Sequence, residues 1–172
     1  MTISMYQASV PRFVNILGNL SNILDKAQAH VDAKKIDAAA LPTYRLFPDM
    51  LPMTKQVQIA CDTAKGVVAR LAGVDIPVFE DNETTIAELR QRIRKTIDYV
   101  QSVPAAQIDG SDEREISVPR RAGPITMKGE MYLKHFVLPN FFFHVTTVYA
   151  LLRHNGVSLG KSDFLAGLTT AA

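Results

Sequence analysis

The segment at residues 136–152, FVLPNFFFHVTTVYALL, constrains the fold more than any other part of the chain, because it contains no Asp, Glu, Lys or Arg. At ~100° per residue, three of its polar side chains fall on one face of a helix: Asn140, His144 and Thr147. An apolar helix with one polar stripe is typical either of a core that contains a satisfied polar network or of the wall of a site. The sequence alone leaves both interpretations open.

The same segment is the only candidate for a membrane span in the sequence. It is shorter than the ~20 apolar residues that cross a bilayer, and it contains Pro139, Asn140 and His144. We therefore expect a core helix and no membrane. The single cysteine, Cys61, excludes an intrachain disulfide, and the first residues lack the pattern of a signal peptide. These features predict a cytoplasmic protein.

The composition fits one folded domain at residues 1–172. Hydrophobic residues make up 47% of the chain, which is enough for a full core. The 19 basic and 17 acidic residues nearly cancel, to a formal net charge of +2. Because this balance does not indicate a polyanion-binding surface, we expect no nucleic-acid partner.

Apolar periodicity predicts three further long helices, at about residues 4–31, 49–71 and 86–100. Pro11 either opens the first helix, with Ser9 as its N-cap, or kinks it. Gly73 is expected to end the second helix. Thr85 and Glu88 form a capping-box pattern before the third.

The region at residues 103–130 contains prolines and glycines that break any long helix. The runs EISVP (115–119) and PITMK (124–128) predict a small β-hairpin beside the last helix. Because Leu138 precedes a proline, the last helix either begins near Pro139 or carries residues 132–138 as a separate, kinked turn. Together these elements predict an all-α four-helix bundle with a small β-hairpin before the last helix.

Two of the predicted helices carry polar residues whose orientation the sequence leaves open. Gln58 and Asp62 lie beside the apolar stripe of the second helix, where such a pair faces either the rim or the bundle interior. On the third helix, Arg92 is expected on a solvated face, paired with Glu88.

His144 is the residue best suited to chemistry, since an imidazole serves as a metal ligand or general base near neutral pH. With Asn140 one turn earlier and Gln58 or Asp62 opposite, one nitrogen and two or three oxygens would form a site. The alternative is a buried histidine hydrogen-bonded to Asn140, Thr147 or a backbone carbonyl.

Three segments of the chain carry a family resemblance: LFPDMLPMTKQVQIACDTAK (46–65), VARLAG (68–73) and LPNFFFHVTTVYALLRHNGVSLGKSDFLAG (138–167). They resemble a bacterial family within the DinB/YfiT-like superfamily of four-helix bundles, whose members are regarded as metalloenzymes. The resemblance covers nearly the whole chain, and the block at 138–167 is its most specific part. It implies an up-down-down-up bundle and a homodimer.

The resemblance also implies a metal site, because many superfamily members hold nickel or zinc with three histidines. One histidine comes from the second helix, and two come from an H-x-x-x-H on the last. His144 matches the second member of that pair, and Asn140 stands at the first position. Residues 49–71 contain no histidine, so Gln58 and Asp62 are the nearest polar candidates there.

These observations lead to three hypotheses about function. The one we favour is a DinB-like bundle with a degenerate metal site and no cofactor, which binds a small molecule or a partner near His144, Asn140, Gln58, Asp62 and Thr147. The second is an enzyme of the thiol-dependent transferase or hydrolase type that binds a divalent metal, nickel or zinc, through His144 and a divergent set of ligands. The third is a structural dimer subunit in which the polar stripe serves only folding.

Overall fold

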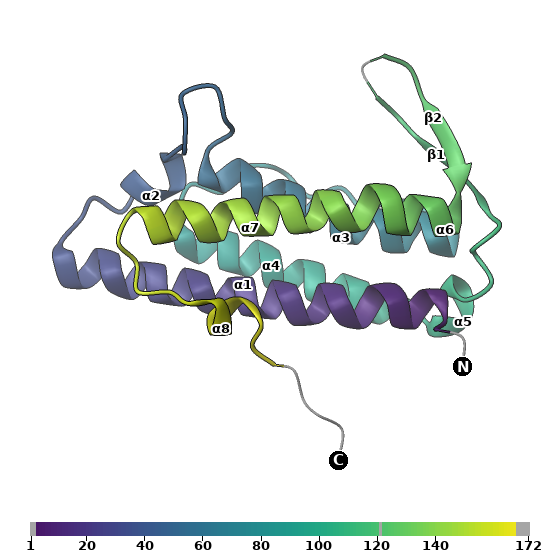
Figure 1. The fold of residues 1–172 in the computed structure, drawn as a ribbon, viewed down its shortest axis with the longest axis horizontal. Helices are drawn as coiled ribbons and strands as arrows, with labels where there is room; N and C mark the ends of the chain where they lie inside the picture. Colours follow the sequence, from purple (N-terminus) through teal and green to yellow (C-terminus); the bar gives the residue numbers. More distant parts are fainter. Residues whose placement is uncertain (1–2, 121, 168–172) are drawn as a thin grey trace.

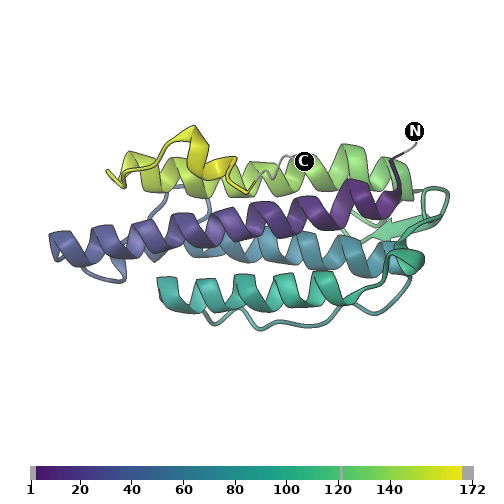
Figure 2. The ribbon, with the colours of Figure 1, turned by 90° about the horizontal axis from the view of Figure 1, so that it is seen from below.

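Four long helices form the bundle in the computed structural model, which describes residues 3–120 and 122–167 (Figure 1). They are α1 (Met5–Lys34), α3 (Met53–Ala72), α4 (Ile86–Ser102) and α7 (Leu138–His154). Helices α1 and α7 run one way and α3 and α4 the other, because residues 73–85 return along the outside of the bundle before α4 begins (Figure 2). The predicted up-down-down-up four-helix bundle is therefore confirmed.

The connections carry short elements. The short helices are α2 (Ala40–Thr43), α5 (Ala105–Ile108), α6 (Gly129–Met131) and α8 (Lys161–Phe164). The hairpin consists of β1 (Glu115–Val118) and β2 (Ile125–Lys128), which are antiparallel with Val118 opposite Ile125. It projects from one end of the bundle (Figure 1), and the prediction of a hairpin before the last long helix is confirmed.

The start of α1 rules out the alternative in which Pro11 opens the helix. Ser4 is the N-cap, and its hydroxyl accepts a hydrogen bond from the Gln7 N–H at 3.3 Å. Pro11 lies inside the helix. The prediction of Ser9 as the N-cap was wrong, because its buried hydroxyl donates to the Met5 carbonyl at 2.6 Å within the helix.

The residue that ends α3 and the residues that cap the start of α4 are those that the sequence predicts. Helix α3 begins after Pro52, later than expected, and ends at Gly73, whose φ of 72° is left-handed. The Thr85–Glu88 capping box is present at α4. Hydrogen bonds from the backbone and hydroxyl groups of Thr84 and Thr85 lower the pKa of Glu88 to about 2.

The last helix is preceded by η1 (Tyr132–Val137), a π-helical segment that follows directly on α6. Leu138 has α geometry, with φ −61° and ψ −47°, although its place before Pro139 predicted otherwise. Because Pro139 lacks an N–H and its ring crowds the preceding turn, the wider π turn accommodates it without ending the helix.

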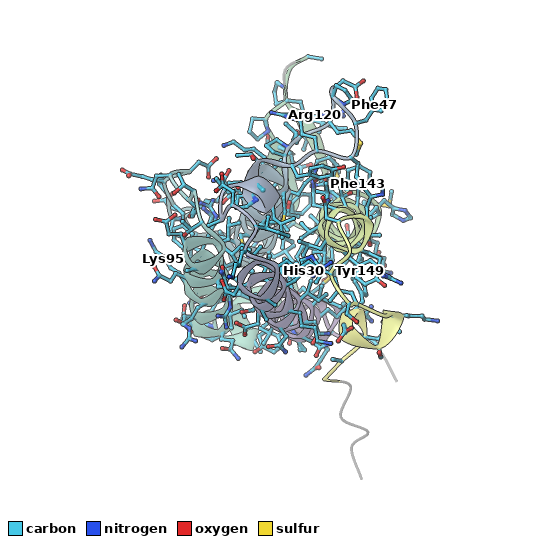
Figure 3. The ribbon with its side chains drawn as sticks, turned by 90° about the vertical axis from the view of Figure 1, so that its left-hand side faces the viewer. His30, Phe47, Lys95, Arg120, Phe143 and Tyr149 are labelled. Carbon is cyan, nitrogen blue, oxygen red and sulfur yellow. The ribbon has the colours of Figure 1, made fainter. Side chains whose placement is uncertain are left out.

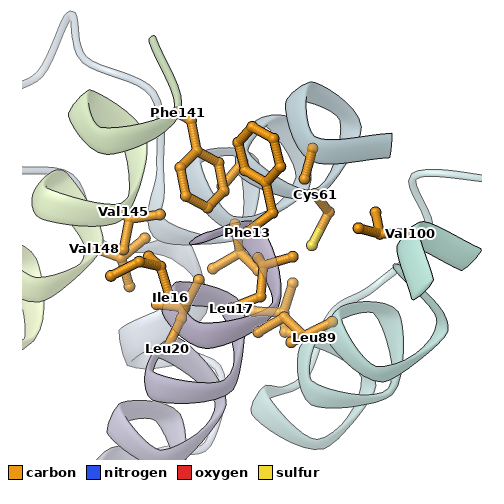
Figure 4. Packing of buried hydrophobic residues seen from close by; sticks show 14 of the residues in the cluster. Phe13, Ile16, Leu17, Leu20, Cys61, Leu89, Val100, Phe141, Val145 and Val148 are labelled. Atoms are coloured by element: carbon orange, nitrogen blue, oxygen red, sulfur yellow. The ribbon is translucent and has the colours of Figure 1, made fainter. Parts of the chain in front are cut away.

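The core lies among the four long helices (Figure 4). Phe13 of α1 meets Phe141 of α7 edge to face, with ring centroids 4.9 Å apart. The continuous helical stretch Gly129–His154 contains an 18-residue window with a mean hydropathy of 1.3, so its length and composition alone would suit a membrane span. Its buried side chains pack into this core, which is typical of the central helix of a soluble bundle.

Candidate functional site

His144 is held by a partner that the sequence did not predict. Its Nδ1 lies 2.6 Å from Oε1 of Gln56 on α3, and both side chains are buried. Because an amide oxygen only accepts hydrogen bonds, Nδ1 carries the proton and Nε2 keeps its lone pair in the neutral ring. Burial lowers the pKa of His144 below its ordinary value, so the neutral form is favoured.

The other two residues of the α7 stripe make separate contacts. The Asn140 side-chain amide donates to the hydroxyl of Thr63 on α3 at 3.1 Å. The Thr147 hydroxyl donates to the Phe143 carbonyl one turn earlier, at 2.7 Å. The expected bond from His144 to Asn140, Thr147 or a backbone carbonyl is therefore replaced by the contact with Gln56.

Gln58 and Asp62 bond toward α4 and the connection at residues 73–85. The Gln58 side-chain amide donates to Glu83 at 2.8 Å, and the Asp62 carboxylate pairs with Arg92 at 2.9 Å and with Lys65 at 3.0 Å. Figure 3 shows α4, marked by Lys95, and α7, marked by Phe143, on different sides of the bundle.

The five candidate residues therefore do not form one cluster; they are His144, Asn140, Gln58, Asp62 and Thr147.

These donors do not fit the three-histidine metal site that the resemblance implies. His144 is the single imidazole in the neighbourhood described above, and its nearest partners are amides and hydroxyls. Within residues 3–120 and 122–167, no group of three or more His, Cys, Asp or Glu side chains is placed to hold a metal ion.

A cavity of about 280 Å³ lies where α3, η1, α7 and the hairpin meet, and we call it the α3–η1–α7 cavity. It brings two of the sequence candidates, Asn140 and Asp62, to one place, whereas His144, Gln58 and Thr147 are not part of its lining. Its further polar residues are Thr63, Arg70 and Tyr132. Its apolar lining consists of Ile59, Val118, Phe136 and Val137.

Arg70 and Tyr132 line the cavity, and the sequence analysis did not identify either of them as a site residue. Nη1 of Arg70 donates to the Tyr132 hydroxyl at 3.2 Å, and the guanidinium lies 6.0 Å from the centre of the Tyr132 ring. The sequence contains a spacing pattern for the α3 residues, although it does not tell which face of α3 is turned toward α7. Gln56, Thr63 and Arg70 are seven residues apart, which places them on one face of α3.

Four other hollows are larger, at about 720, 630, 380 and 330 Å³, and the first two of these are less suited to a charged ligand. One, of about 630 Å³, lies between α4 and residues 78–83, where Arg92 is paired with Glu83. The other, of about 720 Å³, lies between the start of α1 and η1. Its charged residues balance, with Arg12 and Lys134 against Asp112 and Glu130.

Cys61 is not a candidate nucleophile. Its side chain is fully buried, and desolvation raises the pKa of the thiol to about 12. Because the thiolate is the reactive form, this cysteine behaves as a small core residue.

Comparisons with known proteins agree with the fold. The chain matches the family described as "Domain of unknown function (DUF1993)" over residues 5–165. It is also similar to a crystal structure of a DinB family member protein from Shewanella denitrificans. That match has 42% identity and a TM-score of 0.90, and it covers 97% of this chain and 94% of the other. No curated protein matches the chain. The chain therefore belongs to the DUF1993 family, a DinB-like family of unknown function.

Proposed function

We propose that this protein binds a small organic molecule in the α3–η1–α7 cavity. The observation that carries the proposal is the meeting of several polar side chains with an apolar wall beside Asn140. Ligand sites combine these two features, because apolar walls supply affinity and a few polar groups fix orientation. Asn140 occupies the position that matches the first histidine of the superfamily's last-helix pair, so the cavity adjoins the place where the resemblance implies a metal.

The experiment is a fragment screen by amide NMR of the folded protein. We expect fragments that shift the signals of Thr63, Tyr132 and Asn140. Asn140→Leu should abolish these shifts, because it replaces a polar lining group with a bulkier apolar one. Asn22→Leu is the matched control, since Asn22 is exposed on α1. Fragments that bind equally well to the wild type and to Asn140→Leu would exclude this cavity.

A divalent-metal-dependent enzyme anchored on His144 is the second candidate. One observation favours it: among the described residues, no hydrogen bond engages Nε2 of His144, the nitrogen that keeps the lone pair. The surrounding amides and hydroxyls do not complete a zinc or nickel site, so we place this candidate second.

A further inference from the structure

The α3–η1–α7 cavity contains a cation that is not neutralised. None of the ion pairs among the described residues involves Arg70. Its one hydrogen bond to a side chain in this part of the chain goes to the neutral Tyr132 hydroxyl. Asp62 also lines the cavity, but its carboxylate is already compensated by Arg92 and Lys65. Among the described residues, the lining therefore carries one carboxylate that is already paired and one guanidinium that is in no ion pair.

Gly66 allows the Arg70 side chain to lie along α3 beside this cavity. A Cβ built on Gly66 would lie 2.8 Å from Nη1 of Arg70, closer than such atoms approach in folded proteins. No other side chain lies within 4 Å of that Cβ among the described residues. The glycine thus leaves space for the guanidinium, and together with Arg70 it also lines a second hollow of about 380 Å³.

The other polar groups of the cavity favour a ligand that accepts hydrogen bonds. The Thr63 hydroxyl accepts from Asn140, so its own O–H is available to donate. The Tyr132 hydroxyl accepts from Arg70 and is likewise available as a donor. A guanidinium that lines the same cavity as two hydroxyl donors matches a carboxylate, whose two oxygens accept in one plane.

The walls of the cavity indicate the character of the rest of the ligand. The cavity is open to solvent, and its volume of about 280 Å³ lies just below the usual range for small-molecule sites, so it suits a compact group. Phe136 and Tyr132 stack with ring centroids 6.0 Å apart on one side, and Ile59 and Val118 contribute aliphatic surface. Such walls suit a compact apolar or aromatic body. They suit a phosphate ion poorly, because it has no apolar part and carries more charge than one arginine compensates.

We propose that the α3–η1–α7 cavity binds a small monocarboxylate with an apolar or aromatic body, and that Arg70 anchors its carboxylate. This inference rests on the proposed function, and it adds the chemical class of the ligand and the residue that selects it.

The test compares acids with their neutral isosteres by amide NMR titration. The probes are benzoate and 3-methylbutanoate, their primary amides, and inorganic phosphate. We expect each carboxylate to bind about tenfold or more tightly than its amide, because a charge-assisted hydrogen bond is replaced by a neutral one. Phosphate should bind more weakly than benzoate. Equal affinity for acid and amide, or tighter binding of phosphate, would overturn the assignment.

Two variants locate the effect at Arg70. Arg70→Gln should remove the preference for benzoate over benzamide while both still bind. Arg94→Gln, the matched change at an exposed arginine of α4, should leave the preference intact. Gly66→Ala should also weaken benzoate binding, because the added Cβ displaces the guanidinium. A preference that survives in Arg70→Gln would contradict the role of this residue.

The outcomes separate the two proposals. If acids and amides both bind here with equal affinity, the cavity is a ligand site but the carboxylate inference fails. If none of the probes shifts the signals of Thr63, Tyr132 or Asn140, the carboxylate inference fails, and the fragment screen alone decides the proposed function. Circular dichroism of each variant checks that its fold is unchanged. With an unchanged fold, a change in binding reports on the substituted side chain.

Discussion

His144 is an imidazole whose protonation is changed by its place in the bundle. Its ring is buried against Gln56, and burial lowers its pKa below the ordinary value of 6.5. In the unfolded chain the imidazole is in water and titrates near that ordinary value. As the pH falls below 6.5, the unfolded chain therefore binds a proton that the native imidazole does not bind.

This difference predicts a loss of stability in mild acid. The contribution of His144 is fully present above pH 6.5 and is lost as the pH falls through the lower pKa of the folded state. We expect the free energy of unfolding, measured by urea denaturation, to be lower at pH 5.5 than at pH 7.5. His144→Gln should reduce this loss. His135→Gln, at an exposed position in η1, should not. The prediction fails if His144→Gln and wild type lose the same amount.

At the scale of elements, the long connection between α3 and α4 is fixed by Arg92. This side chain is 1% exposed and pairs with Glu83, Asp81 and Asp62 at 3.0, 3.0 and 2.9 Å. Glu83 is 10% exposed, whereas the two aspartates are more than 40% exposed, so the Arg92–Glu83 pair is the buried part of the cluster. The cluster joins α3, α4 and residues 81–83.

Removal of Arg92 should therefore destabilise the bundle strongly. Arg92→Ala leaves the Glu83 carboxylate buried without its cation, and breaking such a pair costs about 3–5 kcal/mol. Arg94→Ala, two residues further along the same helix but exposed, should change stability by no more than about 0.5 kcal/mol. Chemical denaturation of both variants at pH 7.5 measures the difference. Similar effects of the two substitutions would show that the cluster contributes little.

Arg92 also shows where sequence reasoning reached its limit. We expected a solvated Glu88–Arg92 pair from the i, i+4 spacing. Instead, Glu88 is held by Thr84 and Thr85 in the capping box, and Arg92 is covered by the returning connection. The capping box was predictable because it depends on residues three apart. The burial of Arg92 depends on residues nine to thirty positions away, which periodicity does not encode.

At the scale of the whole molecule, the bundle and its hairpin were predictable because apolar periodicity and turn residues act locally. The site was predictable only in part. Asn140 and His144 were found because they interrupt an apolar segment, whereas Gln56, Thr63 and Arg70 were not found because α3 contains many polar residues. Which of these face α7 is decided by how α3 and α7 pack against each other.

The packing of α3 against α7 also determines which side chains surround His144, and these bear on metal binding. The superfamily resemblance implies three nitrogen ligands in this part of the bundle. The structure has one imidazole there, that of His144, and its Nδ1 is hydrogen-bonded to Gln56. Amide and hydroxyl groups bind zinc and nickel weakly in comparison with histidine nitrogen. We therefore expect elemental analysis of untagged protein, purified without chelator, to show far less than one nickel, zinc or iron per chain. His144→Ala should show the same low content. A near-stoichiometric metal that is lost in His144→Ala would contradict this expectation and make the enzyme hypothesis the leading one.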